Sequence, residues 1–178
     1  MKSSLSIPFI LLLIISPYQV HAKDIHLANT DAQVYFSPNG GCTDAIVKEL
    51  DKAKSEILVQ AYSFTSREIA KAFIDAHKRG IPIQIILDRS NRSGKYSAGD
   101  FTAHMGIPTF IDSVHAIAHN KIIIIDKEIV ITGSFNFTKA AEEKNAENLL
   151  IIHSKELAKE YIDNWNEHRK HSEVYEGK

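Results

Sequence analysis

The polar residues between positions 119 and 136 are the part of the sequence best suited to chemistry. Two apolar stretches run through this segment, and the polar side chains beside them are His119, Lys121, Asp126, Ser134 and Asn136. Alternate side chains of a strand share a face, so His119 and Lys121 should point the same way. The same spacing relates Ser134 to Asn136, and a hairpin can bring the two pairs together. Asp126 stands five positions after Lys121, and this odd offset favours the other face or the turn.

These residue types suit an anion that carries a transferable group. Lys121 supplies positive charge, and Ser134 and Asn136 supply directional hydrogen bonds. Gly133 precedes them and permits a tight turn or a close approach to a ligand. A phosphodiester fits, because it carries one negative charge and needs no metal where cations and donors are already in place. The sequence contains no HxH, HExxH or clustered carboxylate pattern, so we expect neither a metal site nor a cofactor.

The spacing of these residues resembles a known motif. His119-x-Lys121-x4-Asp126-x6-Gly133-Ser134-x-Asn136 is similar to the HKD motif of the phospholipase D superfamily, and six fixed positions over 18 residues are hard to match by chance. Glu147, which opens the stretch ENLLII, resembles the family's downstream acidic position. A short chain with one such motif looks most like the small bacterial secreted endonucleases of this superfamily.

The resemblance implies a shared active site. Family enzymes use two HKD motifs per site and this sequence has one, so two chains are expected to form a homodimer. One His119 would attack phosphorus and form a phosphohistidine, and the second chain's His119 would protonate the leaving oxygen and then activate water. Physical reasoning agrees, because in-line displacement places nucleophile and leaving group on opposite sides of phosphorus.

The resemblance also assigns the remaining roles. Glu147 would orient His119. The predicted catalytic set is His119, Lys121, Asp126 and Glu147, and the predicted phosphate ligands are Lys121, Ser134 and Asn136. Asp126 belongs to this set as the last motif residue, although in the family it is mainly structural, in agreement with its spacing.

Around the motif, amphipathic helical patterns alternate with apolar strands. Helices are expected over 43–54, from the capping box Thr65-Ser66-Arg67-Glu68 to Gly80, over 100–105, over 138–144 and after Ser154. Strands are expected over 56–62, 82–88, 109–112, 119–125, 128–132 and 147–153. This order predicts one α/β domain over residues 23–178, with a mixed, largely parallel sheet flanked by helices on both faces, similar to a phospholipase D or nuclease sandwich. Strand order stays open.

Composition excludes several classes of protein. The chain has 178 residues, 44% of them hydrophobic, which suits one globular domain and excludes global disorder. Lys and Arg number 21 against 22 Asp and Glu, so a polyanion must be held by a local cluster of cations. The single cysteine, Cys42, can form neither an internal disulfide nor a Cys-based zinc cage. It could pair between chains in an oxidising compartment, but we expect a small buried hydrophobe near a helix start.

Residues 1–22 have the order of a secretory signal peptide. Lys2 precedes the apolar run 7–15, and Val20-His21-Ala22 follows. The apolar core has nine residues, whereas a membrane span needs about 20. We therefore expect cleavage after Ala22 and a mature chain in the periplasm or outside the cell, with no stable membrane association.

The expected function is that of a homodimeric, metal-independent phosphodiesterase that cleaves DNA, and also RNA, without strong sequence preference. Arg89, Arg92 and Lys95 form either a track for a nucleic-acid backbone or an ordinary solvated loop. One alternative is a phospholipase D acting on phospholipid head groups, which would need an apolar lipid-binding surface. Another is a nucleic-acid-binding module with an inactive site. The remaining expectations concern side chains without a role in chemistry: Trp165 and Tyr161 in the core, and His153, His168 and His171 at the surface or in the core.

Overall fold

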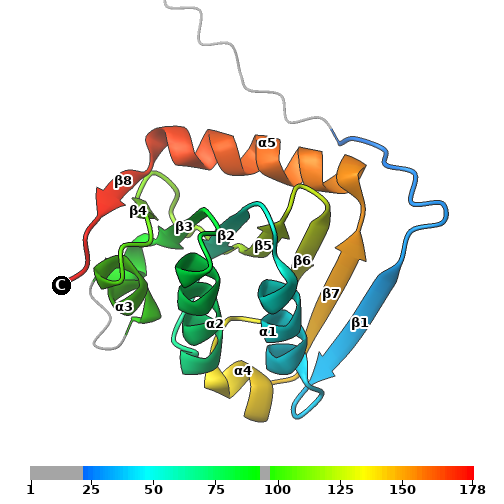
Figure 1. Ribbon diagram of the computed structural model, residues 1–178, viewed down its shortest axis with the longest axis horizontal. Helices are drawn as coiled ribbons and strands as arrows, with labels where there is room; N and C mark the ends of the chain where they lie inside the picture. The colour runs from blue at the N-terminus through cyan, green and yellow to red at the C-terminus, as the bar shows by residue number, and fades with distance from the viewer. Residues whose placement is uncertain (1–21, 93–96) are drawn as a thin grey trace, which may run out of the picture.

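The computed structural model describes residues 22–92 and 97–178; residues 1–21 of the expected signal peptide, and Lys95, lie outside this part. An eight-stranded sheet with the order β1-β7-β6-β5-β2-β3-β4-β8 runs through the protein (Figure 1). The strands are β1 (Ala32–Ser37), β2 (Ile57–Ala61), β3 (Ile83–Asp88), β4 (Thr109–Asp112), β5 (Lys121–Ile125), β6 (Ile129–Gly133), β7 (Glu147–His153) and β8 (Glu173–Tyr175). The helices are α1 (Cys42–Lys52), α2 (Arg67–Lys78), the 3-10 turn η1 (Arg89–Arg92), α3 (Ala98–His104), α4 (Lys139–Glu143) and α5 (Lys155–His171).

The sheet is mixed, as expected, but the expectation that it is largely parallel is wrong. Within the described sheet only the pairs β2–β3 and β3–β4 are parallel, and the other neighbours are antiparallel. The alternation of strands and helices from β2 to β4 produces the parallel part, because each crossover helix returns the chain to the end of the sheet at which the previous strand began. The hairpin β5–β6 then pairs antiparallel with β2, and the two edge strands β1 and β8 also run antiparallel to their neighbours.

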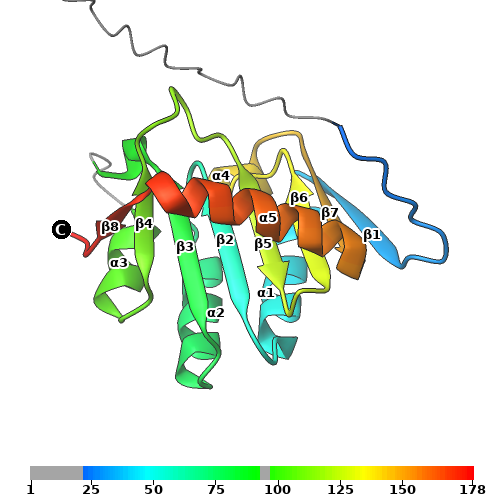
Figure 2. The same ribbon diagram turned by 90° about the horizontal axis from the view of Figure 1, so that it is seen from above.

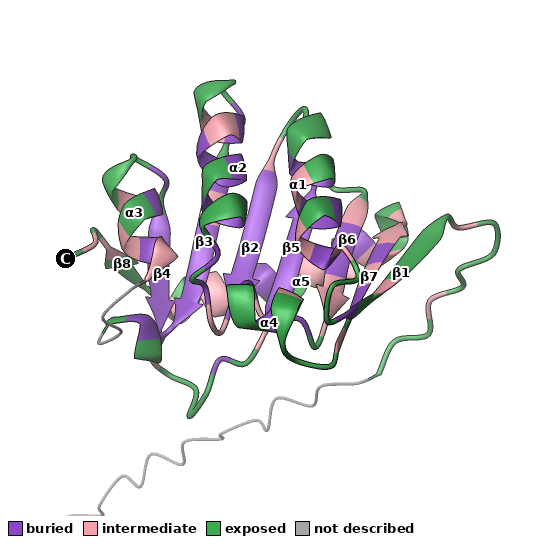
Figure 3. Cartoon of the chain, turned by 90° about the horizontal axis from the view of Figure 1, so that it is seen from below, coloured by how far each residue is buried: buried purple, intermediate pink, exposed green. Residues whose placement is uncertain are grey.

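Helices cover both faces of the sheet, which confirms the predicted α/β sandwich. Figure 2 shows α1 and α2 on one face and α5 crossing the other. Buried side chains of β2 alternate between the two cores, since Ile57 and Val59 pack with α1 and α2 whereas Leu58 packs with α5. The central strands are therefore buried on both sides (Figure 3), which explains why their sequences are continuous apolar runs. No helix in the described ranges has the length and apolar character needed to cross a bilayer.

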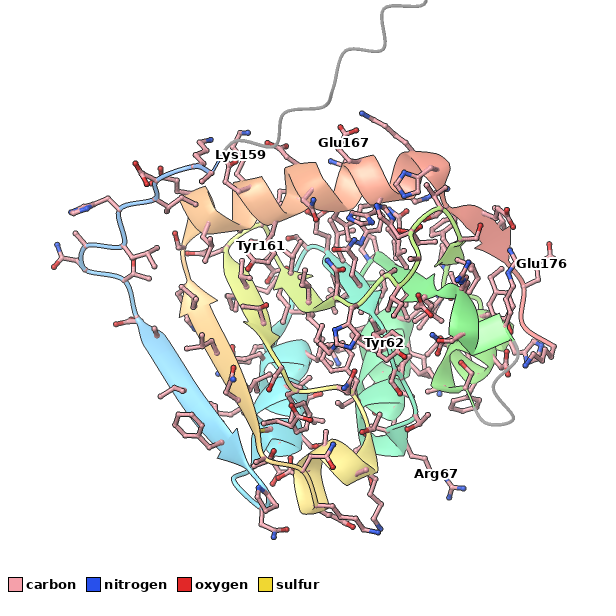
Figure 4. The ribbon with its side chains drawn as sticks, turned by 180° about the vertical axis from the view of Figure 1, so that it is seen from behind. Tyr62, Arg67, Lys159, Tyr161, Glu167 and Glu176 are labelled. Atoms are coloured by element: carbon pink, nitrogen blue, oxygen red, sulfur yellow. The ribbon has the colours of Figure 1, made fainter. Side chains whose placement is uncertain are left out.

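Helix α5 is amphipathic, and its tryptophan is buried against the sheet. Lys159 and Glu167 point away from the sheet, and Tyr161 points toward it (Figure 4). Trp165 is 2% exposed, and its Nε1–H donates to the carbonyl oxygen of Val59 in β2 at 3.0 Å. Trp165 thus belongs to the core, as predicted, and Tyr161 is partly buried and packs against it.

The starts of α1 and α2 agree closely with their sequence signals. The Ser66 hydroxyl accepts a hydrogen bond from the backbone N–H of Ile69, so the N-cap of α2 is Ser66 and not Thr65. Cys42 opens α1 and is fully buried. Burial, together with the negative charge of Glu142, raises the pKa of the Cys42 thiol to about 11. The expectation of a small buried side chain near a helix start is thus confirmed.

Candidate active site

One end of the sheet collects most of the predicted site residues. Lys121 begins β5 opposite Ala61, the last residue of β2. At the same end, β6 finishes at Gly133 and β7 begins at Glu147. The structure thus places Lys121 and Glu147 at strand starts on one end of the sheet, with His119 just before β5 and Ser134 and Asn136 just after β6.

His119 and Lys121 form the centre of this site, and Tyr62 lies against both of them. The His119 side chain is exposed, and its ring centroid lies 4.5 Å from that of Tyr62, which follows β2 near the middle of the view in Figure 4. Lys121 is only 7% exposed; its Nζ donates to the carbonyl oxygen of His119 at 2.7 Å and lies 5.1 Å from the Tyr62 ring centroid. Tyr62 therefore helps to position both groups, and the only signal in the sequence was its place as the last residue of the predicted strand 56–62.

The ammonium group of Lys121 is largely shielded from solvent. Burial lowers the pKa of Lys121, and the negative charge of Glu147 opposes this shift. The Glu147 carboxylate accepts a hydrogen bond from the Asn145 side chain at 3.2 Å. In the described part of the chain Glu147 makes no hydrogen bond to His119, so the proposed role of Glu147 in orienting His119 stays a prediction. The negative charge of Glu147 acts on Lys121.

Ser134 and Asn136 alternate with two buried rings. Phe135 and Phe137 are fully buried, so the intervening polar side chains face the other way. The Ser134 hydroxyl accepts from the backbone N–H of Asn148 at 3.1 Å. The Oδ1 atom of Asn136 is buried and finds no hydrogen-bond partner among the described residues. A buried polar atom without a partner is costly, so this site is well suited to a group that the single chain does not supply.

Gly133 brings the strand that carries these residues close to β7. Its φ is +150°, and a Cβ atom there would lie 2.3 Å from the backbone oxygen of Asn148. We expect Gly133→Ala to lower the free energy of unfolding by about 2–4 kcal/mol and to reduce turnover, because the backbone of Ser134 must move away from Asn148. Urea unfolding and phosphodiester hydrolysis measure the two effects.

A matched control for this prediction is Gly80→Ala. Gly80 also has a positive φ, +88°, but open space surrounds the position of its missing Cβ. This substitution should cost about 1 kcal/mol through backbone strain alone, with no effect on turnover. Equal losses in the two variants would contradict the role given to the close contact at Gly133.

Asp126 does not join the site, which corrects its inclusion in the predicted catalytic set. It follows β5 at the end opposite Lys121, in a tight turn where Asp126 and Lys127 have φ of 56° and 58°. Its carboxylate accepts hydrogen bonds from the backbone N–H groups of Lys54 and Ser55, at 2.6–3.0 Å. Burial alone would raise the pKa of Asp126, but these bonds outweigh it and hold the pKa below its usual range. Asp126 therefore ties the hairpin turn to the chain before β2.

We expect Asp126→Asn to destabilise the fold by about 1–3 kcal/mol at neutral pH without lowering the turnover of the folded protein. Because the folded-state pKa is depressed, the carboxylate's contribution is present above its unfolded pKa of about 3.9 and is lost as pH falls through the folded value. The gap between wild type and variant in urea unfolding should thus shrink at acid pH. Asp163→Asn, at an exposed position of α5, is the control and should change stability little. A large loss of turnover in Asp126→Asn would contradict the structural role.

Two further groups frame the site. The carboxylate of the buried Asp88, at the end of β3, accepts from the backbone N–H of Ala118 at 2.8 Å and so fixes the segment that leads into His119. The turn η1 packs at the same end, since the Asn91 side chain donates to the carbonyl oxygen of Tyr62 at 2.8 Å. Of its arginines, Arg92 pairs with Glu173 and Arg89 is exposed. A track for a nucleic-acid backbone along these residues stays a prediction.

Comparison with known proteins identifies the family of this chain. Residues 46–169, more than half of the chain, match the family model described as "Cardiolipin synthase, PLD-like domain". The chain belongs to the phospholipase D (PLD) superfamily. The expected resemblance to this superfamily is confirmed.

Relatives and solved structures of the PLD superfamily carry different names. The chain is 45% identical to a phospholipase D of Rickettsia conorii over 154 residues, which is 86% of this chain and 77% of the relative. It is 26% identical to human mitochondrial cardiolipin hydrolase over 156 residues, covering 83% and 62% of the two chains. The crystal structure of Nuc from Salmonella typhimurium, a phospholipase D family member, superposes with a TM-score of 0.79 at 40% identity, covering 82% of this chain and 98% of Nuc.

Proposed function

We propose that this protein is a homodimeric phosphodiesterase that cleaves DNA, and also RNA, without strong sequence preference and without a catalytic metal ion. The observation that carries the proposal is one exposed imidazole, His119, held beside the buried charge of Lys121 in a chain with a single HKD motif. Membership of the PLD superfamily supports phosphodiester chemistry. The likeness to Nuc, at 40% identity over nearly its whole length, favours a nucleic acid as the substrate.

The reaction proceeds in two displacements at one phosphorus atom. A ring nitrogen of His119 forms a bond to phosphorus while the bond to the leaving oxygen breaks, and the His119 of a second copy donates a proton to that oxygen. Water then attacks the phosphohistidine, the second imidazole accepts the proton of the water, and the phosphorus–nitrogen bond breaks. Lys121 and Asn136 from both copies surround the phosphate, and their positive charge and hydrogen bonds stabilise the five-coordinate transition state.

The geometry of displacement at phosphorus supports a second copy. One imidazole cannot stand on both sides of phosphorus at once, and a two-fold axis supplies the second one. Two large apolar side chains are also exposed in the segment that leads into His119, namely Val114 at 67% and Ile117 at 59%. An interface between copies at this end of the sheet would cover them, and it would also supply a partner to the buried Oδ1 of Asn136.

The charge of the protein fits weak, non-specific binding. The formal net charge is −1, so phosphate contacts must be concentrated near the site, and binding should weaken steeply with added salt. Contacts to phosphate carry no sequence information, which agrees with cleavage at any sequence.

A phospholipase D activity is the second candidate, and one observation favours it. Relatives at 43–45% identity from several Rickettsia species are named phospholipase D. The chemistry at phosphorus would be the same, and Val114 and Ile117 would face lipid instead of a second copy.

Substrate comparison separates these candidates. Plasmid DNA and single-stranded RNA should be hydrolysed at least about 100-fold faster than vesicles of phosphatidylcholine or cardiolipin at equal phosphodiester concentration. The reverse order would establish the phospholipase, and no turnover of either substrate would leave a binding module. Turnover should persist in excess EDTA, because Lys121 and the hydrogen-bond donors take the place of a metal ion.

The location of the protein follows from the signal peptide expected at residues 1–22. We propose that cleavage after Ala22 releases a mature chain that begins at Lys23 in the periplasm or outside the cell. Fractionation of the producing cell and N-terminal sequencing of the protein test this, and an uncleaved chain in the cytoplasm would contradict it.

A further inference from the structure

Figure 2 shows the C-terminal end of α5 passing beside β4. Four side chains outside the HKD set come together in this region. We name them the Asp112 cluster: Asp112, His115, His168 and His171. Asp112 ends β4, His115 lies in the loop that follows, and His168 and His171 come from the last turns of α5. Their potential metal-binding atoms all lie within 4.8 Å of one another.

The three imidazoles converge on one carboxylate oxygen. The Oδ2 atom of Asp112 lies 2.7 Å from Nδ1 of His168, 2.9 Å from Nδ1 of His115 and 3.3 Å from Nε2 of His171. In a tetrahedral zinc site the donor atoms are about 3.3 Å apart, because each lies about 2.0–2.1 Å from the metal. Small side-chain adjustments would thus place all four donors around one ion.

The burial of the cluster gives it a closed end and an open end. The Asp112 side chain is fully buried, whereas the side chains of His168, His171 and His115 are 14%, 32% and 45% exposed. The Asp112 carboxylate also accepts from the backbone N–H of Val114 at 3.2 Å, which fixes its orientation. The imidazoles therefore stand between a fixed buried anion and the solvent, where a cation can enter.

We propose that the Asp112 cluster is a structural binding site for a divalent transition-metal ion, and that Zn²⁺ is the ion that fits its donors best. Three imidazole nitrogens and one carboxylate oxygen are ordinary zinc ligands. Four protein donors complete a tetrahedral shell, so no position stays open for water and the ion takes no part in phosphodiester cleavage. The ion joins β4, the loop after it and α5, and the loop continues directly into His119.

A cluster held by hydrogen bonds alone is the competing explanation of the same contacts. In that case each imidazole carries a proton on the nitrogen that faces Asp112, whereas a metal ion requires the lone pair of that nitrogen. The two explanations differ in whether the protein binds an ion tightly, in the coordination of that ion and in the effect of metal on stability.

The first test starts from the purified protein. Bound metal is removed with a chelator, and the metal-free protein is then dialysed against Zn²⁺ or Co²⁺. We expect about one equivalent of Zn²⁺ per chain by mass spectrometry and a Co²⁺ absorption spectrum with the strong visible bands of tetrahedral coordination. Zn²⁺ at ~100-fold above its Kd should raise Tm by about 5–10 °C. Binding of less than about 0.2 equivalents, or an octahedral Co²⁺ spectrum, would overturn the proposal.

The second test assigns the ion to these side chains. His168→Gln and His171→Gln should each lower Zn²⁺ affinity by at least about 100-fold and abolish the tetrahedral Co²⁺ spectrum. His153→Gln changes a histidine at the end of β7, outside the cluster, and should bind metal as the wild type does. Unchanged binding in the cluster variants would refute the assignment.

A third measurement covers the case in which the cluster variants do not fold. X-ray absorption by Zn²⁺ bound to the wild type should then show four nitrogen or oxygen ligands together with the outer-shell scattering of imidazole rings. Six-fold coordination, a sulfur ligand or the absence of imidazole scattering would refute the assignment.

Discussion

Replacing His119 with alanine should lower phosphodiester turnover by a factor of about 10⁴ or more and leave the fold intact. The substitution removes the nucleophile from one copy and the proton donor from the other, so both displacements fail. The His119 ring is exposed, which predicts little change in the free energy of unfolding. Hydrolysis of an activated diester and urea unfolding measure the two quantities, and His153→Gln serves as the control. Retained turnover in His119→Ala would refute the assigned nucleophile.

Mixed dimers test whether the site is shared. If wild-type and His119→Ala chains are refolded together in equal amounts and pair at random, about one quarter of the dimers contain His119 in both chains. Total turnover should then be about one quarter of the value for wild type alone at the same chain concentration, because the mixed dimers are inactive. A value of about one half would show that each chain works alone, and the proposed mechanism would fail.

The second large effect is expected at Lys121. Lys121→Met keeps an unbranched side chain that is one heavy atom shorter and removes its charge. It should lower kcat/KM by about 10³-fold because the transition state loses a buried positive charge. The same change should leave stability equal or slightly higher, since a buried charge is replaced by an apolar group of similar size. This opposite response of turnover and stability distinguishes a catalytic role from a structural one. Lys155→Met, at an exposed position of α5, should change neither quantity.

The pH dependence of ligand binding checks the same residue. Burial lowers the pKa of Lys121, so its ammonium group should lose its proton at a lower pH than an ordinary lysine, whose pKa is about 10.4. Inhibition by inorganic phosphate should therefore weaken as pH rises through this lowered value. Lys121→Met should bind phosphate weakly at every pH, and a wild-type curve that stays flat up to pH ~10.4 would contradict the assignment.

Local patterns in the sequence were enough to predict which strand ends carry the candidate site. The predicted hairpin forms, with His119 and Lys121 at its start and Ser134 and Asn136 just after its end. Only Lys121 belongs to a strand, so the alternation of side chains along a strand does not by itself explain where the other three residues lie. The same alternation favoured the other face or the turn for Asp126, and the structure places it in the turn, although the motif had included it in the predicted catalytic set. Strands 109–112 and 147–153 were also predicted with the bounds that the structure has, because each is an apolar run with clear ends.

Contacts between distant segments could not be predicted in this way. Tyr62 meets His119 because β2 pairs with β5, and no local pattern specifies that pairing or its antiparallel direction. Strands β1 and β8 were missed because they are edge strands: β1 is largely exposed, and β8 has three residues. The pairs Asp112-x2-His115 and His168-x2-His171 are visible in the sequence, but only the packing of α5 beside β4 joins them.

The bond from Trp165 to Val59 gives the protein an optical reporter of its own. The sequence contains one tryptophan, so all indole fluorescence comes from the place where α5 meets the central strand β2. Loss of that contact would expose the indole to water and shift its emission to longer wavelength. The detachment of α5 can thus be followed in the unlabelled wild-type protein and compared with the backbone signal from circular dichroism. A separation of the two transitions would reveal that the C-terminal helix leaves before the sheet unfolds.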